Sequence, residues 1–450
     1  MKQYASYKDS GVQWLRKIPS HWNSVSFKRL FSFGRGLTIT KADLVEKGLP
    51  VISYGQIHSK QNIGTKIEQH LLRYVPASYI KGNDSSKVNK GDFIFADTSE
   101  DLEGCGNCVY VDNEDLLYAG YHSIIAKSIQ LKENKYFAYL FKTDCWRSQI
   151  RSSVNGVKVF SITQNTLSNS VVLLPPIEDQ RIIASYLDHK VGQIDLVIAE
   201  KEQMLEDFKV YRSAIISEVV TKGLDKNAEM KDSGFDWMGK IPAHWDCSSM
   251  KYYLSETLQY GANESAESDN PDWPRYIRIT DIDEYGNLKK ETFKSLSPEK
   301  AKGYLLERGD VLFARSGATV GKSYIFKEDY KACFAGYLIK AKCGTKLLPE
   351  YLYLFTNTNQ YENWKNSVFI QATIQNIGAD KYSMLPIVVP PLVEQQSIIE
   401  YANFKLSKIE KIILELKSQI VDLNAYKSSI ITEAVTGKVD LRDWELNNKV

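Results

Sequence analysis

The stretch "PPIEDQRIIASYLDHK" at residues 175–190 returns in altered form as "PPLVEQQSIIEYANFK" at 390–405. At a constant offset of 215 positions, the two segments align without a gap as far as Asp225 and Asp440. A Pro-Pro pair cannot continue a preceding helix or strand ladder and suits a helix entry, and roughly 45 residues without proline follow each pair. We therefore predict two similar long helices.

Both predicted helices carry apolar side chains at alternating spacings of three and four residues. Rows sustained over several heptads form an a/d seam, which is typical of a coiled coil. The alternative is an amphipathic helix lying on a globular core, and the length of the seam in both copies disfavours it. The predicted seam consists of Leu187, Val191, Ile194, Ile198, Leu205, Phe208 and Ile215 in the first helix, and of Leu406, Ile409, Ile413, Leu416, Ile420, Leu423 and Ile430 in the second.

A second duplication pairs "KDSGVQWLRKIPSHW" at 8–22 with "KDSGFDWMGKIPAHW" at 231–245. The stretches that follow, 23–174 and 246–389, are rich in short β-like runs separated by Gly, Asn and Asp turns. The chain is thus two copies of one unit, an α/β globule followed by a long helix. The two helices match each other better than the two globules do, which suggests that a common frame holds two globules that recognise different things. Trp14 and Trp237 recur with the duplicated passage, so we expect them to be packing anchors.

The composition limits the class of protein. The 450 residues are 43% hydrophobic and 25% charged, with a net charge of +2, which neither indicates nor excludes a nucleic-acid partner. The N-terminus lacks the apolar core of a secretory signal, and no run is long enough to span a bilayer. Six cysteines are too few for a disulfide scaffold. We expect a cytoplasmic protein that does not contact membranes.

Three local patterns mimic functional motifs. "SGATVGKS" at 316–323 has three residues between Gly317 and Gly321, where a phosphate-binding loop needs four, and a β-like run follows it. The single CxxC of Cys105 and Cys108 could mark a metal or redox site, but it lacks the further ligands of a zinc site and the helix start of a thioredoxin-like unit, so we expect neither. His122 could be a polar reader or a catalytic base, but without a Cys or Ser nucleophile nearby we interpret it as a strand histidine with a satisfied side chain. Without motifs for methyl or hydride transfer, the chain is not expected to be catalytic.

Taken together, these passages resemble the specificity subunit of type I restriction-modification systems over essentially the whole chain. No single passage is decisive, but their order and duplication are specific. Besides the two duplications, the resemblance is carried by "GDFIFADTSEDLEG" (91–104), "VKVFSITQNTL" (157–167) and "GDVLFARSGATVGK" (309–322).

The resemblance implies a mixed α/β fold in which two target-recognition domains are separated by two long helices packed as an antiparallel coiled coil. Each domain would read one half of a bipartite double-stranded DNA site. The subunit would carry no cofactor itself and would assemble with two methyltransferase subunits, which use S-adenosylmethionine to methylate adenine, and two ATP- and Mg-dependent restriction subunits. The expected boundaries are 1–174 and 223–389 for the recognition domains with their lead-ins, 175–222 and 390–437 for the helices, and 438–450 for a tail.

Polar and basic residues on loops next to strands are the candidate base readers, since Arg or Lys can bind guanine and Gln or Asn can pair with adenine in the major groove. An ordinary solvent-facing turn residue is the competing interpretation for each. A coiled-coil adaptor that assembles partners without reading bases is the alternative function. The candidates are Thr98, Ser99, Lys158, Ser161, Thr163, Gln164 and Asn165 in the first domain, and Arg315, Lys322, Gln371, Thr373, Gln375 and Asn376 in the second.

Overall fold

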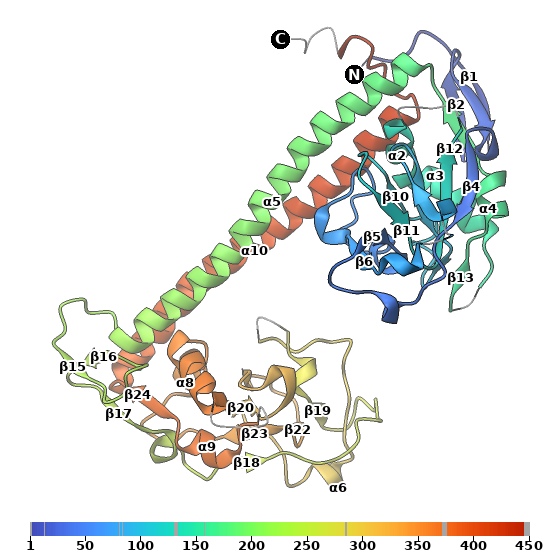
Figure 1. Ribbon diagram of the computed structural model, residues 1–450. Coiled ribbons are helices and arrows are strands. Elements are labelled where there is room, and N and C mark those ends of the chain that lie inside the picture. The colour runs from blue at the N-terminus through green and yellow to red at the C-terminus, as the bar shows by residue number, and fades with distance from the viewer. Residues whose placement is uncertain are drawn as a thin grey trace. The chain divides into compact units, whose positions relative to one another are not determined.

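The computed structural model describes residues 2–12, 14–80, 82, 84–129, 134–156, 158–283, 286–370 and 376–444. The chain divides into two compact units, Met1–Glu200 with Gln419–Val450, and Lys201–Ser418. Each unit holds one globular domain, the start of one long helix and the end of the other (Figure 1).

The domain of the first unit is built on two four-stranded sheets. One is antiparallel, in the order β10-β8-β12-β4, and the other is mixed, in the order β6-β5-β11-β7, with β5 and β11 parallel. Apolar side chains from both sheets, among them Ile94, Ile125, Ile52 and Val88, share one core cluster. The strands are β1 (Tyr7–Val12), β2 (Leu15–Pro19), β3 (Asn23–Ser26), β4 (Phe31–Arg35), β5 (Leu49–Ile52), β6 (Arg73–Val75), β7 (Lys87–Val88), β8 (Phe93–Ala96), β9 (Thr98–Ser99), β10 (Cys108–Tyr110), β11 (Leu117–Ala119), β12 (Ser123–Ser128), β13 (Phe160–Ser161) and β14 (Val171–Leu174), and the helices are α1 (Tyr54–Ile57), α2 (Lys135–Lys142), α3 (Asp144–Ser153), α4 (Gln164–Asn169) and the first part of α5 (Ile177–Lys222).

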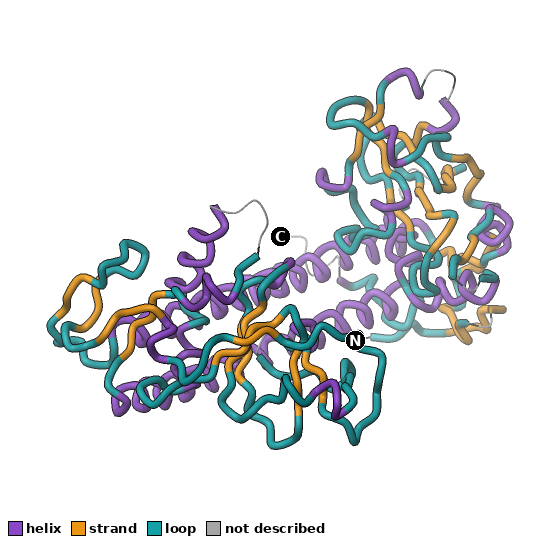
Figure 2. The backbone as a smooth tube through the Cα atoms, turned by 90° about the horizontal axis from the view of Figure 1, so that it is seen from below, coloured by secondary structure: helices purple, strands orange, loops and turns teal. Residues whose placement is uncertain are grey.

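The domain of the second unit repeats this topology with shorter strands. The antiparallel sheet β18-β23-β20-β21 matches β4-β12-β8-β10, and the parallel pair β19 and β22 matches β5 and β11. Loops, drawn in teal, make up much of the rest of this domain (Figure 2). The strands are β15 (Met230–Asp232), β16 (Lys240–Pro242), β17 (Asp246–Ser249), β18 (Gln259–Tyr260), β19 (Arg275–Ile277), β20 (Val311–Ala314), β21 (Ser323–Ile325), β22 (Ala332–Phe334), β23 (Leu338–Ala341) and β24 (Pro386–Val389), and the helices are α6 (Pro298–Ala301), α7 (Pro349–Phe355), α8 (Asn359–Ile370), α9 (Ala379–Ser383) and the first part of α10 (Leu392–Val435).

The same turn introduces the central strand in both domains. Gly91 and Gly309 have φ values of 94° and 96°, a conformation that glycine adopts without strain. The aspartate that follows closes the turn, since Asp92 accepts from the Asn89 amide at 2.9 Å and Asp310 from the Glu307 amide at 2.8 Å. Burial raises the pKa of both carboxyl groups. The duplicated Gly-Asp pair is therefore a structural element of the sheet.

Helices α5 and α10 run antiparallel, as predicted. In the first unit, Ile183 and Leu187 of α5 share a core with Ile431 and Val435 of α10. In the second unit, Ile215 near the end of α5 packs with Ile409 and Ile413 near the start of α10. A glycine with positive φ follows each helix, Gly223 after α5 and Gly437 after α10, and ends it. The mixed α/β fold with two long antiparallel helices is confirmed.

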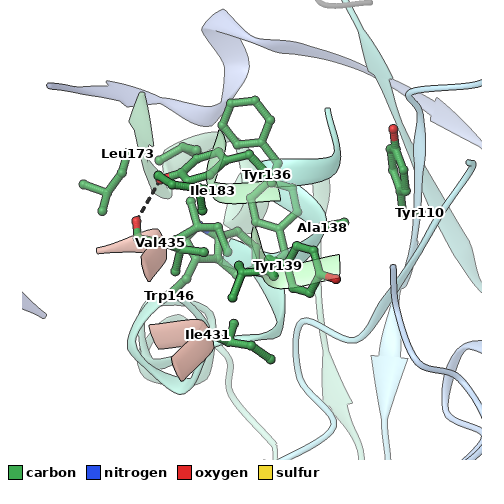
Figure 3. Packing of buried hydrophobic residues seen from close by; sticks show 14 of the residues in the cluster. Tyr110, Tyr136, Ala138, Tyr139, Trp146, Leu173, Ile183, Ile431 and Val435 are labelled. Carbon is green, nitrogen blue, oxygen red and sulfur yellow. Dashed lines mark hydrogen bonds between the residues drawn. The ribbon is translucent and has the colours of Figure 1, made fainter. Parts of the chain in front are cut away.

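Each domain also holds the end of a helix through a buried tyrosine. The Tyr136 hydroxyl donates to the carbonyl oxygen of Val435 in α10 at 2.8 Å, inside the aromatic core drawn in Figure 3. In the second unit, the Tyr351 hydroxyl donates to the carbonyl oxygen of Val220 in α5 at 2.8 Å. The last turns of a helix leave carbonyl groups without intrahelical partners, so these hydroxyls fix each helix end to its domain.

The duplicated lead-in passages form β-hairpins, β1 with β2 and β15 with β16. The predicted packing role of Trp14 and Trp237 is confirmed, because both lie partly buried against the core of their unit. Trp22 and Trp245, at the ends of the two passages, are fully buried.

Candidate nucleic-acid interface

An open groove of about 690 Å³ lies on the first domain. It is bordered by the end of β4, the turn between β11 and β12, the β9 strand, and the segment from β13 into α4. We call it the first groove. Its lining is Arg35, Gly36, Leu37, Thr38, Ile39, Asp97, Thr98, Gly120, Tyr121, His122, Ser123, Ile124, Ser161, Ile162, Thr163, Gln164 and Asn165.

Five of the predicted base readers meet in this groove: Thr98, Ser161, Thr163, Gln164 and Asn165. The pairing of β13 with β9 places Ser161 opposite Thr98. The Thr163 hydroxyl caps α4 by accepting from the Thr166 amide at 3.0 Å. Ser161, Thr163 and Asn165 are exposed.

The other two first-domain candidates lie elsewhere. Ser99 is buried, and its hydroxyl donates to the carbonyl oxygen of Asp101 at 2.7 Å, so this side chain faces the interior. Lys158 is exposed just before β13 and is not part of the groove lining.

The groove also contains polar residues that the sequence did not single out as readers, among them Arg35, Asp97 and Tyr121. His122 lies in the turn that precedes β12 rather than in the strand, with a φ of 52°, in the left-handed region. Its ring nitrogen Nδ1 is 3.2 Å from Oδ1 of Asp97. The interpretation of His122 as a strand histidine was therefore wrong, because the turn between β11 and β12 presents it to solvent.

In the second domain, Arg315 follows β20 directly. Its guanidinium carbon lies 4.9 Å from the ring centre of Tyr260, which places the cation over the aromatic face. Asn376 pairs with Ser316 in an isolated antiparallel bridge, next to Arg315. The Lys322 ammonium donates to the carbonyl oxygen of Ile282 at 2.9 Å, so it is held within the domain. Gln371, Thr373 and Gln375 lie outside the described residues.

The two domains build this region in the same way. A glycine ends the edge strand in each: a Cβ atom at Gly36 would lie 1.9 Å from the carbonyl oxygen of Gly120, and one at Gly261 would lie 2.3 Å from that of Ala335. Any side chain at these positions would collide with the neighbouring turn. The Ser161–Thr98 pair of the first domain corresponds to the Asn376–Ser316 bridge of the second. The backbone frame is thus shared while the polar side chains differ.

The predicted seam residues are distributed over both units. In the first unit, Leu187, Ile194, Ile198 and Ile430 are buried in the core, with Val191, Ile420 and Leu423 partly buried against it. In the second, Leu406 joins the domain core, Ile215, Ile409 and Ile413 form a cluster with Leu205 and Phe208, and Leu416 is also buried. The helices therefore pack on the globular cores near their ends and on each other between them.

The motif mimics have structural roles. Cys105 and Cys108 are buried in the first core, and burial raises the pKa of Cys108 to about 12. Among the described residues, no group of three or more His, Cys, Asp or Glu side chains is arranged to hold a metal ion. Gly317–Thr319 form a short 3-10 turn, and the strand β21 follows it instead of a phosphate-binding helix. In the described part of the chain, no helix has the length and apolar character required to cross a bilayer.

Comparison with known proteins identifies the family. The model described as "Type I restriction modification DNA specificity domain" matches residues 19–206 and 257–422. The chain is 22% identical over 446 residues to the specificity subunit of the type I restriction enzyme EcoKI from Escherichia coli (strain K12), with 96% of this chain and 92% of that relative covered. It is also 22% identical over 447 residues to the StySPI specificity subunit from Salmonella potsdam, with the same coverage.

A solved chain has the same fold. It comes from a structure described as "Structural basis underlying complex assembly and conformational transition of the type I R-M system", and it superimposes with a TM-score of 0.68 at 16% identity. The likeness covers 94% of this chain and 99% of that one. Because the family model matches more than half of the sequence, in one block for each half of the repeat, the chain belongs to the type I restriction-modification specificity family and is the DNA specificity subunit of such a system.

Proposed function

We propose that each domain reads one half of a bipartite double-stranded DNA site. The observation that carries this proposal is the shared backbone frame of the first groove and of the region around Arg315, which holds different polar side chains in the two domains. Sequence-specific readers need polar groups that reach base edges, and two different sets of such groups select two different half-sites.

The parts of the chain then have distinct roles. Residues 1–174 and 223–389 are the two recognition domains with their lead-ins, and 438–450 are the tail, of which 445–450 lie outside the described residues. Residues 175–222 and 390–437 contain α5 and α10, which hold the readers apart and set the number of unspecified base pairs between the half-sites. At about 1.5 Å per residue, the 46-residue α5 is roughly 69 Å long, enough to separate two DNA-reading surfaces.

The chain itself is noncatalytic in this proposal and acts as an assembly scaffold in the cytoplasm. Two methyltransferase subunits would supply S-adenosylmethionine-dependent adenine methylation, and two restriction subunits would supply ATP- and Mg-dependent cleavage. The support comes from family membership and from a solved relative whose description concerns complex assembly of a type I system.

The test uses the full chain with its methyltransferase subunits. We expect adenine methylation at one split sequence with a fixed gap when a DNA library with randomised bases is treated with the complex. We also expect a mobility shift of the full chain on DNA carrying that sequence, compared with a scrambled sequence of the same length. A complex that methylates with no preferred bases in either half would contradict base reading and support the adaptor function.

A further inference from the structure

Asp97 of the first domain and Arg315 of the second occupy the same position of the repeat. The Asp97 amide donates to the carbonyl oxygen of His122 at 3.3 Å, and the Arg315 amide donates to that of Tyr337 at 3.0 Å. On the other side, the carbonyl oxygen of Asp97 accepts from the Ile162 amide at 2.7 Å, and that of Arg315 from the Ile377 amide at 2.8 Å. Both residues directly follow the equivalent strands β8 and β20.

The first domain places a carboxylate at this position. The Asp97 side chain lines the first groove, is 34% exposed, and has His122 at 3.2 Å. An ionised carboxylate only accepts hydrogen bonds, so it selects ligand groups that carry N–H or O–H. Among base edges in the major groove, the amino group of cytosine is the donor with which Asp and Glu pair.

The second domain places a donor fork there instead. The Arg315 guanidinium lies over Tyr260, whose hydroxyl accepts from the Ala379 amide at 2.9 Å and is therefore fixed from α9. Within the described part of the chain, the Nε atom of Arg315 is buried without a hydrogen-bond partner. Because this Nε has no access to solvent, a base contact falls to the two terminal Nη groups of the half-buried, stacked guanidinium, whose N–H donors match the O6 and N7 acceptors of guanine.

We propose that this shared position selects one base in each half-site, with Asp97 accepting from the amino group of a cytosine and Arg315 donating to a guanine. This inference rests on the proposed function, in which each domain reads one half-site. It adds which residue of each domain determines the preferred base at one position of that half-site. One backbone frame thereby gives opposite base preferences through the charge of a single side chain.

The experiment compares Asp97→Asn and Arg315→Lys with wild type in the full complex with methyltransferase subunits, on a library randomised in both half-sites. The amide of an asparagine can accept and donate, so we expect Asp97→Asn to lose the preference for cytosine at one position of the first half-site by about 5- to 150-fold. Arg315→Lys keeps the charge but loses the planar fork, so we expect a similar loss for guanine at one position of the second half-site. The other half-site and the gap remain unchanged in each variant.

Matched controls are Asp115→Asn, an exposed acid outside the first groove, and Arg308→Lys, an exposed arginine paired with Asp329. Both should keep the wild-type map, and unfolding midpoints should show that all four variants are folded. An unchanged map for Asp97→Asn and Arg315→Lys, or methylation lowered equally on all sequences, overturns the inference while the bipartite site of wild type stands. If wild type itself shows no bipartite site, the proposed function fails and this inference fails with it.

Discussion

The indole nitrogen of Trp22 lies 2.9 Å from the carboxylate of Asp179, and it donates a hydrogen bond from the end of the lead-in passage to the first turn of α5. The second copy repeats the bond between Trp245 and Glu394 of α10, also at 2.9 Å. The histidine before each tryptophan approaches the same carboxylate at 2.8 Å. The duplicated "HW" therefore anchors each helix start to its lead-in, and this explains why the passage occurs twice.

Replacing Asp179 with alanine should destabilise the first unit. The Trp22 N–H is buried and would lose its acceptor, which costs about 1.5–3 kcal/mol for a bond to a charged group. The Asp179 side chain is 8% exposed, whereas that of Glu394 is 41% exposed, so water can replace Glu394 and Glu394→Ala should cost about 1 kcal/mol or less. Hydrogen exchange of amides in each unit measures both losses.

The control for this comparison is Glu178→Ala, which removes a neighbouring, exposed acid from the same helix turn. If Glu178→Ala destabilised the first unit as much as Asp179→Ala, the effect would come from the charge at the helix start and not from the bond to Trp22.

Removing the buried tyrosine hydroxyls should loosen the helix ends one at a time. Tyr136→Phe leaves the Val435 carbonyl without its donor, and Tyr351→Phe does the same to Val220. An unsatisfied buried acceptor costs about 1–3 kcal/mol, so the last turn of α10 should exchange faster in the first variant and the last turn of α5 in the second. Each variant serves as the control for the other, and faster exchange at both helix ends in either variant would contradict local anchoring.

The sequence predicted the helices and the repeat because their signals are local: Pro-Pro starts, heptad spacing and duplicated passages. The groove was harder to predict from the sequence, because its lining residues come from separate segments that come together only in the folded chain. Arg35, Asp97 and His122 lie on three separate segments, and no spacing in the sequence relates them. Ser99 shows a different difficulty. Serine is common in solvent-facing turns, so the sequence suggested an accessible side chain, but in the fold this side chain is buried. Lys322 resembles a free basic reader, but it is engaged by the Ile282 carbonyl.

Lys142 should make the protein more stable as the pH rises from about 8 to 10.5. Burial lowers the pKa of its ammonium from 10.5 to about 8, while the unfolded chain retains the ordinary value. Between pH 8 and 10.5 the unfolded state therefore binds more protons, and the free energy of unfolding rises with pH, by on the order of 3 kcal/mol from this group. Below pH 8 the cost of the buried charge is fully present, and above 10.5 it is gone.

Lys142→Met removes this group, so the variant should lack that rise in a urea titration repeated from pH 7.5 to 10.5. Buried tyrosines and cysteines with raised pKa values, such as Cys108, lower the free energy of unfolding as the pH increases. The measured quantity is therefore the difference in the free energy of unfolding between the variant and wild type at each pH. Lys135→Met, which removes a half-exposed lysine paired with Asp188, is the control and should follow wild type. A constant difference between Lys142→Met and wild type would mean that Lys142 stays charged throughout.

The helix pair should act as a ruler for the gap between half-sites. Lys427 pairs with Asp195 at 2.7 Å, which fixes the register of α10 against α5 in the first unit. Inserting one heptad directly after Asp195 and another directly before Lys427 keeps the seam in phase and lengthens both helices by about 10.5 Å, or roughly three base pairs. The methylation map should keep both half-sites and gain about three unspecified base pairs. As a control, a heptad inserted into only one helix shifts its seam against that of the other helix, so the methylated half-sites should no longer be separated by a fixed gap. If the double insertion left the gap unchanged, the helices would not set the number of base pairs between the half-sites.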